Sequence, residues 1–485
     1  MSLTQPEVMQ KLDSIEREYD CFDLQIGGTP IWEYIKPSII TSARTKHTHS
    51  GSGNFNKRGD TKTDLDGLIS FCKNTLSYNY SPLLLPNCDI LIYGFSRRKL
   101  GRDNKMIDHI SDPFGEILTK IGYSWALLEN PISAAPGYHY KSNKTPNKNL
   151  FYNDFNHFLP RIMSRLHLKN YKLSRNEKKD IRFISQKVDS SLGVSMSTWP
   201  SEQYESIIEY RQVQIKLYDW ILERVDPLIL VVVNRDRARP LIEVARNKNI
   251  PVVELQHGVI NELHPGFRYP DEAVPATAPT HFFTWGKEWG ERINVSQFTL
   301  ENIGYPYSNK EYNRVSSIKK SNRIVIFSQH FCGNRMANIA IKLANLFAGS
   351  NTEIVFKPHP IVGTCVENFY PQLQGSSVVT FTDQQPDLYE LFATSQAQVG
   401  VSSTTLFEGL RFNLKTYVVD EYTCTYMDDL LSKDYAKMVS SAEEIYNDYI
   451  SNEKMELNMT PYFSEIDLEQ ISGTLSEIAQ TQTKF

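Results

Sequence analysis

The sequence contains no closely spaced pair of cysteines. Six cysteines are scattered over 485 residues without a CxxC pair: Cys21, Cys72, Cys88, Cys332, Cys365 and Cys424. Zinc sites and disulfide frameworks need cysteines at short, regular spacings, so this pattern favours neither and fits a reducing compartment. We therefore expect a cytoplasmic protein that holds no metal.

Long apolar runs and an excess of one charge are also missing. No uninterrupted apolar run reaches the roughly 18–20 residues that cross a bilayer, and residues 1–20 lack the apolar core of a signal peptide. The 52 Lys and Arg residues against 56 Asp and Glu residues give a net charge of −4, which provides no general attraction to nucleic acid. The sequence predicts a soluble or membrane-peripheral protein that does not bind nucleic acid.

What the sequence does contain is a long alternation of apolar strands and helices. The expected strands are 88–94, 124–128, 228–233, 251–255 and 281–285, then 323–327, 353–356, 377–382, 397–401 and 415–419. Helical patterns cover much of 1–80 and 150–225, and a polar connection covers 307–322. Continuous apolar strands that alternate with helices indicate parallel sheets covered on both faces.

The chain length bounds the number of domains, because 485 residues are too many for one core. We expect an α/β protein with two Rossmann-like, doubly wound domains that face a central cleft. Residues 1–310, with helical additions, form the first domain and residues 320–462 form the second. Residues 463–485 form a helix that packs back on the first domain.

Three loops directly follow apolar strands, and such loops line the ligand crevice of an open α/β sheet. They contain His257 in Gln256-His-Gly258, His359 in Lys357-Pro-His-Pro360, and the polar segment 400–405. We therefore expect all three on one functional rim.

The loop 400–405 contributes the small hydroxylated residues Ser402, Ser403 and Thr404. Free N–H groups, hydroxyls and the partial positive charge of a helix N-terminus can together bind a phosphate. The alternative is simple N-capping of the following helix. Glu408, one turn further on, either accepts hydrogen bonds from a ribose or closes a capping box with that turn.

The segment Lys357-Pro-His-Pro360 is held rigid by its two prolines. A cation at Lys357 or at a protonated His359 would balance the charge that builds up on a leaving phosphate. We therefore expect both residues on the side of the cleft that binds the phosphate.

His257 is the first candidate for a catalytic base on the opposite side of the cleft. An imidazole with a pKa of about 6.5 suits that task near neutral pH, and Gly258 permits a close approach to a ligand. Glu254 and Glu262 are rival bases, although Glu254 falls inside a strand, where a paired carboxylate is the alternative.

Two further clusters of charged residues follow expected strands. Arg235, Arg237 and Arg239 follow the strand 228–233 and either bind an anionic acceptor or pair with acids at a helix start. Asp108 and Asp112 come after the strand 88–94 and are alternative catalytic bases.

A basic stretch covers residues 161–187, with nine Lys and Arg residues against two acids. Such a stretch is typical of a solvated helical face. A contact with an anionic membrane surface is the alternative.

The motifs together resemble those of GT-B transferases for bacterial surface polysaccharides. They are Gln256-His-Gly258, Gly304-Tyr-Pro306, Lys357-Pro-His-Pro360 and Ser402-Ser403 with Glu408, and the resemblance covers about residues 228–420. Capsule Kdo transferases, bacterial sialyl- and polysialyltransferases and teichoic-acid glycerophosphotransferases are the most similar families. The resemblance implies that His359, Ser402 and Ser403 bind the nucleotide phosphate, that Glu408 holds the ribose and that His257 acts as base.

The resemblance also implies a function. We expect a metal-independent glycosyltransferase with no cofactor, which moves a sugar from a CMP- or CDP-type donor to a growing capsule or lipopolysaccharide glycan. Its partners are the nucleotide-sugar donor, a lipid-linked or oligosaccharide acceptor and, as an open alternative, the inner face of the cytoplasmic membrane. Three other functions stay open: a polyol-phosphate transferase, a sugar-nucleotide epimerase, and a non-catalytic subunit of a polysaccharide assembly complex.

Overall fold

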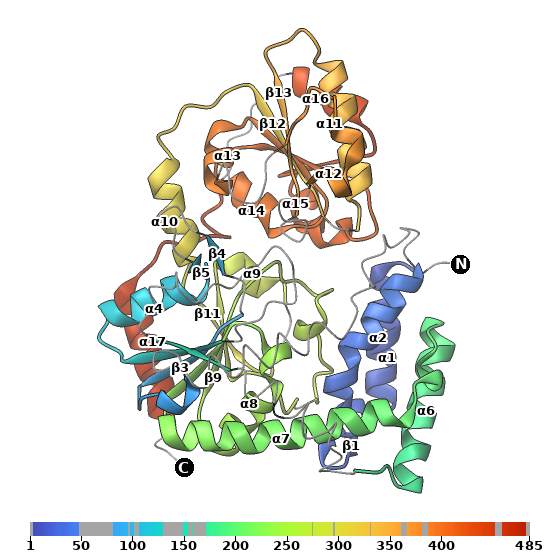
Figure 1. Ribbon diagram of the computed structural model, residues 1–485, viewed down its shortest axis with the longest axis vertical. Coiled ribbons are helices and arrows are strands. Elements are labelled where there is room, and N and C mark those ends of the chain that lie inside the picture. Colours follow the sequence, from blue (N-terminus) through green and yellow to red (C-terminus); the bar gives the residue numbers. More distant parts are fainter. Residues whose placement is uncertain are drawn as a thin grey trace.

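The chain folds around two parallel β-sheets, one above the other in the computed structural model (Figure 1). The structure describes residues 3–47, 81–95, 98–100, 106–129, 149–153, 159, 171–273, 275–293, 296–329, 331–359, 366–380, 387–451 and 458–481. The predicted loop around residues 50–60 and the basic residues 161–170 lie outside this set.

The first sheet is built from seven strands in the described part of the chain. They are β3 (Ile90–Tyr93), β6 (Trp125–Glu129), β7 (Leu150–Tyr152), β8 (Ile229–Val232), β9 (Val252–Leu255), β10 (His281–Thr284) and β11 (Thr299–Asn302). Their spatial order is β11-β10-β9-β8-β3-β6-β7, and all neighbours are parallel. From β3 the chain adds β6 and β7 toward one edge of the sheet. It then returns to the middle and adds β8, β9, β10 and β11 toward the other edge.

The second sheet repeats this winding with six strands among the described residues. They are β12 (Arg323–Phe327), β13 (Glu353–Lys357), β14 (Val379–Thr380), β15 (Ala397–Gly400), β16 (Lys415–Val419) and β17 (Lys437–Val439). The parallel order is β14-β13-β12-β15-β16-β17, so the winding reverses between β12 and β15. This is the strand order of a Rossmann fold.

Helices cover both faces of both sheets. In the first domain they are α4 (Ser111–Lys120), α7 (Ser201–Val225), α8 (Arg235–Asn247) and α9 (Lys287–Glu291). In the second they are α11 (Gly333–Leu346), α12 (Val366–Phe369), α13 (Leu388–Thr394), α14 (Thr404–Leu410), α15 (Asp428–Ser432) and α16 (Ala442–Ile450). Ile90 and Ile92 pack with α4 on one face, whereas Leu91 and Tyr93 pack with α7 and α8 on the other. The apolar strands predicted from the sequence are thus buried on both sides.

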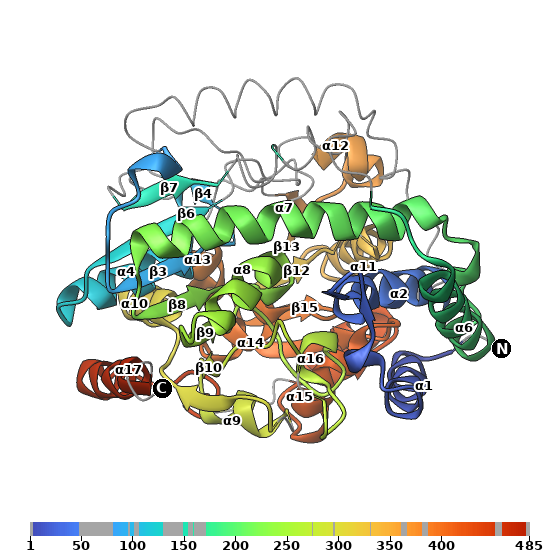
Figure 2. The ribbon, with the colours of Figure 1, turned by 90° about the horizontal axis from the view of Figure 1, so that it is seen from below.

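A separate helical unit stands beside the first domain. Its helices are α1 (Gln5–Glu18), α2 (Ile31–His47) and α6 (Arg175–Leu192), with the short strands β1 (Gln25–Ile26) and β2 (Thr29–Pro30). These elements share an apolar core of their own, which includes the fully buried Trp32. The long helix α7 extends from beneath the first sheet to this unit (Figure 2).

The end of the chain lies against the first domain. Helix α17 (Leu468–Thr481) packs with the core of the first sheet, and the Ser476 hydroxyl lies 3.1 Å from the Tyr123 hydroxyl. The segment before it passes close to two glycines. A Cβ atom on Gly304 would lie 2.5 Å from the Ser464 carbonyl oxygen, and one on Gly286 would lie 2.3 Å from the Pro461 carbonyl oxygen.

Several elements differ from the sequence-based expectation. The polar segment 307–322 is a helix in its first half, α10 (Pro306–Val315), rather than a connection. Residues 150–225 include the buried strand β7. By contrast, Asn234 caps α8, so Arg235 and Arg237 lie in its first turn, at the helix start that the sequence offered as one alternative. A two-stranded antiparallel ribbon, β4 (Lys99–Leu100) and β5 (Met106–Ile107), also follows the first strand.

Candidate functional site

A cavity of about 300 Å³ opens at the carboxyl ends of the strands of the second sheet. Both domains and the helical unit contribute to its wall. The residues lining it are Arg44, Val259, His264, Gln329, Phe331, His359, Ser402, Thr404, Thr423 and Tyr426.

The reversal of strand order explains where this cavity forms. The loops after β12 and β15 run to opposite sides of the second sheet, which leaves a crevice between them. Gln329 follows β12, His359 follows β13, and Ser402 and Thr404 follow β15. Val259 and His264 come from the loop after β9 of the first sheet, so the strand ends of both sheets face the same space.

Hydrogen bonds fix the hydroxyl loop that follows β15. The Ser402 hydroxyl lies 2.7 Å from the Thr423 hydroxyl and donates to Gln329 Oε1 at 3.2 Å. Gln329 Nε2 in turn donates to the Ser402 carbonyl at 2.6 Å. This network joins the ends of three strands and holds the hydroxyls of the cavity in place.

Ser403 has a different role from its two neighbours. Its hydroxyl accepts a hydrogen bond from Thr405 N at 3.2 Å and caps α14. The capping alternative therefore describes Ser403, while Ser402 and Thr404 line the cavity.

Glu408 is buried in α14 with 8% of its surface exposed, and it accepts a hydrogen bond from the Tyr389 hydroxyl. The capping-box alternative for Glu408 is wrong, because Ser403 is the cap and Leu406, not Glu408, occupies the third helical position. Glu408 does not reach the wall of the cavity. The ribose contact stays a prediction.

Lys357 and His359 differ in whether they reach the cavity. Lys357 ends β13, and its carbonyl accepts a hydrogen bond from Ser328 N at 3.0 Å. His359 lines the cavity, whereas Lys357 does not. Pro360 lies outside the described residues.

His257 lies at the corresponding rim of the first sheet, where the winding reverses between β3 and β8. Its Nε2 is 3.1 Å from Asn234 Nδ2, and its ring packs 5.3 Å from the ring of Phe95. A Cβ atom on the adjacent Gly258 would lie 3.7 Å from the Thr404 hydroxyl, so the two predicted loops approach each other across the cleft. His257 itself is beside the cavity rather than in its wall.

Asp108 and Asp112 belong to a buried ion cluster. Arg98, with a fully buried side chain, pairs with Asp112 at 2.6 Å and with Glu129 at 2.9 Å. Burial opposes ionisation of Asp108, but the charges of His109 and Arg98 and two backbone N–H groups outweigh it and lower the pKa of Asp108. Structural contacts thus occupy both aspartates, and the lowered pKa makes Asp108 a poor proton acceptor.

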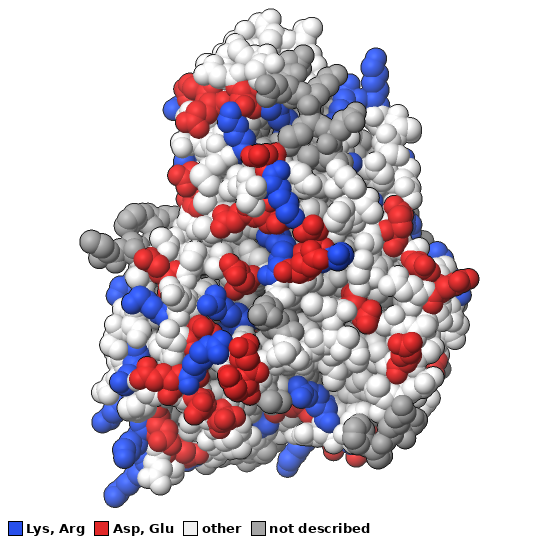
Figure 3. Space-filling view, turned by 180° about the vertical axis from the view of Figure 1, so that it is seen from behind, with Lys and Arg blue, Asp and Glu red and all other residues white. Residues whose placement is uncertain are grey.

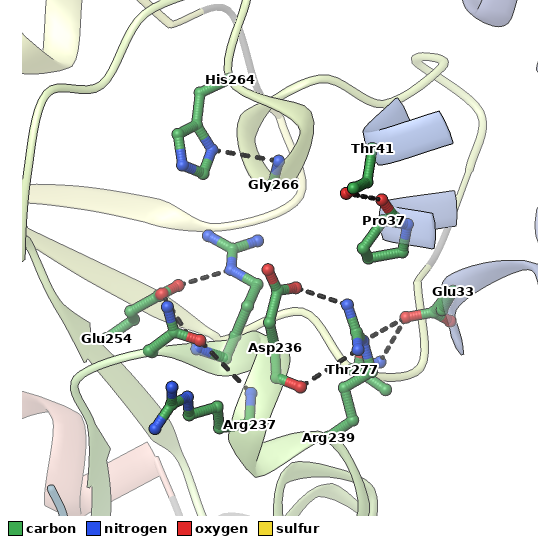
Figure 4. Close-up of polar contacts among 12 residues, drawn as sticks. Glu33, Pro37, Thr41, Asp236, Arg237, Arg239, Glu254, His264, Gly266 and Thr277 are labelled. Atoms are coloured by element: carbon green, nitrogen blue, oxygen red, sulfur yellow. Dashed lines mark hydrogen bonds and ion pairs between the residues drawn. The ribbon is translucent and has the colours of Figure 1, made fainter. Parts of the chain in front are cut away.

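The three arginines after β8 also have structural partners. Arg235 is buried, pairs with Glu254 at 2.5 Å and donates to the Tyr269 hydroxyl at 2.9 Å. Arg239 pairs with Asp236 in the first turn of α8 (Figure 4). The pairing alternative therefore describes Arg235 and Arg239, and Glu254 is a paired carboxylate rather than a rival base.

Arg237 is the exposed member of that arginine cluster. Its guanidinium lies 4.8 Å from the centre of the Phe95 ring, on the same side of the sheet as His257. A contact between Arg237 and an anionic acceptor stays a prediction.

His264 lines the cavity and was not singled out by the sequence. Its Nδ1 accepts a hydrogen bond from Gly266 N at 3.2 Å (Figure 4). Burial lowers the pKa of His264 to about 4, so the ring is neutral near pH 7. Since Nδ1 accepts, the proton resides on Nε2, which is the ring's hydrogen-bond donor. The pair His264-Pro265 repeats the His-Pro pair of His359, a signal that could have drawn attention to it.

Two Rossmann-type sheets thus face one another across a cavity at their carboxyl ends, and the end of the chain returns to the first domain. The chain adopts the GT-B fold. No protein-family model and no curated protein sequence matches it.

Several solved structures have a similar GT-B arrangement. The UDP-GlcNAc 2-epimerase of Methanocaldococcus jannaschii, solved with UDP-GlcNAc and UDP, is 11% identical, with 80% of this chain and 99% of that chain covered and a TM-score of 0.46. S. aureus MnaA, solved with UDP, is 12% identical, with coverages of 82% and 98% and a TM-score of 0.47. The spinosyn rhamnosyltransferase SpnG is 13% identical, with coverages of 81% and 96% and a TM-score of 0.42. Identities this low assign this chain no activity.

The surface of this GT-B protein mixes both charges. On the face shown in Figure 3, basic and acidic side chains are interspersed over both domains. Apart from Lys172, the described cations of the predicted basic stretch lie on α6, where Arg175, Lys178, Lys179 and Arg182 are exposed. Within the described residues, no group of His, Cys, Asp and Glu side chains could hold a metal ion. None of the helices described combines the length and apolar character needed to cross a membrane.

Proposed function

We propose that the chain is a glycosyltransferase that moves a sugar from a nucleotide-activated donor to a growing surface glycan. The common cavity carries this proposal: His359, Ser402 and Thr404, expected from the sequence to bind the donor, line it together with residues of the other domain. A volume of about 300 Å³ lies at the lower end of the range for small-molecule sites. It suits the compact phosphate part of a nucleotide better than a whole nucleotide sugar.

In such a transfer the bond between the sugar and the donor phosphate breaks, and the phosphate leaves with the electron pair. The acceptor hydroxyl forms the new bond to the sugar and loses its proton. Hydrogen-bond donors that are already in place stabilise the charge on the leaving phosphate. We assign that role to the hydroxyls of Ser402 and Thr404 and to the imidazole of His359, with Lys357 adding positive charge at the rim.

His257 is our candidate for the base that takes the acceptor proton. The Asn234 side-chain oxygen accepts from Arg237 N, which leaves the Asn234 amide NH₂ group to donate to His257 Nε2. Nε2 is therefore the basic nitrogen. To act as base, His257 exchanges this hydrogen bond for one to the acceptor hydroxyl, and Asn234 is a positioning residue.

The nature of the donor and acceptor follows the resemblance of the motifs. We propose a CMP- or CDP-type donor, metal-independent transfer, and a capsule or lipopolysaccharide glycan as acceptor at the cytoplasmic face of the membrane. Glu408 is assigned to the ribose, for which its hydrogen bond with Tyr389 has to be exchanged.

Nucleotide titration of the wild type and the His359→Ala variant tests this function. A ligand that binds only the folded protein, present at a hundred times its Kd, raises the free energy of unfolding by about 2.7 kcal/mol. A thermal-shift screen of CMP, CDP, UDP and GDP therefore identifies the nucleobase that the protein prefers. We expect at least one nucleotide to bind. His359→Ala, with an unchanged circular dichroism spectrum, should lose that binding and abolish transfer. Near-wild-type turnover by the folded variant would contradict the assignment.

Turnover assays separate the other functions. Conversion of a free nucleotide sugar without an acceptor indicates an epimerase, and transfer from a CDP-polyol indicates a polyol-phosphate transferase. Nucleotide binding without turnover of any donor indicates a non-catalytic subunit.

A further inference from the structure

One residue of the cavity comes from outside both Rossmann-type domains. Arg44 lies in the last turn of α2, in the helical unit that packs around its own apolar core. In Figure 1, α2 rises from the side of the first domain toward the second. The helical unit is therefore a third component of the site rather than a remote addition.

The guanidinium of Arg44 is oriented by an aromatic ring instead of a carboxylate. It lies 5.1 Å from the centre of the Phe331 ring, which follows β12 in the second domain. Arg44 is exposed, and it forms no hydrogen bond or ion pair with any residue that the structure describes. Stacking on an aromatic face leaves the N–H groups at the edge of the guanidinium available for a bidentate contact with an anion.

The remaining wall of the cavity offers this cation no compensating charge. None of the described lining residues is acidic; they contribute hydroxyls, an amide, two imidazoles and apolar surface. The field of Arg44 also reaches Tyr426 of the same cavity, where burial raises the pKa of Tyr426 and Arg44 partly offsets that rise. A positive, hydroxyl-lined cavity of this size fits a phosphate group.

We propose that Arg44 binds the phosphate of the nucleotide from the side opposite the Ser402–Thr404 loop. This assignment rests on the proposed function and extends it, because it makes the N-terminal helical unit part of the donor site. Arg44 thereby sets the preference for ligands with more phosphate charge. It also links ligand binding to the contact between α2 and the second domain.

Calorimetric titrations of wild type, Arg44→Gln and Arg44→Lys test the proposal. The probes are CMP, CDP, UMP, UDP, pyrophosphate, and the uncharged nucleosides cytidine and uridine. Arg175→Gln, which removes an exposed cation at the start of α6, is the matched control. Arg44→Gln should weaken binding of the phosphate-bearing probes by about ten- to a hundredfold. Diphosphates should lose more than monophosphates, and Arg44→Lys should recover part of the affinity. Nucleosides should bind all variants equally.

Three results would overturn the assignment, and they are distinguishable. If the wild type binds these nucleotides and Arg44→Gln binds them with the same affinity, Arg44 is no phosphate ligand while the proposed function stands. If the wild type binds none of the probes, the proposed function fails and the assignment fails with it. An equal loss of affinity in Arg175→Gln also overturns it, because the effect would then come from overall charge.

Discussion

At the scale of single residues, the buried ion pair of Arg235 and Glu254 allows a test of whether Arg235 stabilises the fold or binds an acceptor. Arg235→Met leaves the buried Glu254 carboxylate without its cation, with only the backbone N–H of residue 235 still donating to it, so we expect the free energy of unfolding to fall by about 3–5 kcal/mol. The double variant Arg235→Met with Glu254→Gln should lose clearly less free energy of unfolding, because no buried carboxylate is left without its cation. Urea unfolding of both variants measures this. Unchanged stability together with a raised KM for the acceptor would instead support acceptor binding by Arg235.

His264 gives the protein a specific dependence on pH. Its pKa of about 4 in the folded chain lies below the roughly 6.5 of an unfolded chain. The unfolded state therefore takes up a proton first as the pH falls. The stability that neutral His264 contributes is complete above about pH 6.5 and is lost between pH 6.5 and 4, by at most about 1.4 kcal/mol per pH unit.

The variant His264→Asn isolates that dependence. Asparagine retains an acceptor for Gly266 N but does not titrate, so the fall in urea midpoint between pH 6.5 and 4 should become shallower than in wild type. Identical pH profiles for the two proteins would show that His264 is protonated as readily in the folded as in the unfolded state.

The sequence could reveal only those site residues that directly follow apolar strands. His359, Ser402 and Thr404 have this local signal, and the cavity contains all three. Arg44 and Tyr426 have none, because they lie far apart in the sequence on helical turns and only tertiary packing brings them to the same cavity. The partners that bury a charge, as Glu254 does for Arg235, are equally invisible before the chain folds.

At the scale of elements, the return of the chain end depends on glycines that leave room for it. Gly304 and Gly349 have nearly the same backbone angle, with φ of +79° and +80°. A Cβ atom would meet the Ser464 backbone at 2.5 Å in Gly304 but open space in Gly349. Gly349→Ala should therefore lower the free energy of unfolding by about 1–2 kcal/mol through backbone strain alone. Gly304→Ala should lower it by about 1–3 kcal/mol more, because its Cβ atom also clashes with the Ser464 backbone.

Chemical unfolding of the two glycine variants measures that difference. Equal losses of stability would mean that residues 458–466 shift away without cost, and that the return of the chain end is weakly held.

Elements were predictable where burial imposed a clear pattern. Strands such as β8 and β12 are continuous apolar runs because helices cover both faces of their sheets. The strands β7 and β17 sit at sheet edges and have three residues each, which is too short for a pattern. Helix α10 was missed because its sequence is largely polar; its contacts with α4 and α13 form only when the chain folds.

At the scale of the whole molecule, apolar packing joins the two Rossmann-type domains on one side of the cleft. The Trp289 ring of α9 lies 4.6 Å from the Phe407 ring of α14, within a core cluster that contains residues of both sheets. The helical unit contacts the second domain through Arg44 of α2 and Phe331. We expect any opening of the cleft to pivot on the apolar side and to separate α2 from the second domain.

The central claim is that the cavity between these domains holds the phosphate of a nucleotide donor. A crystal structure with the tightest-binding nucleotide tests it most directly. We predict density for the phosphate within hydrogen-bond distance of His359, Ser402 and Thr404, with the Arg44 guanidinium on its other side. A nucleotide bound elsewhere, with this cavity holding only water, would contradict the account.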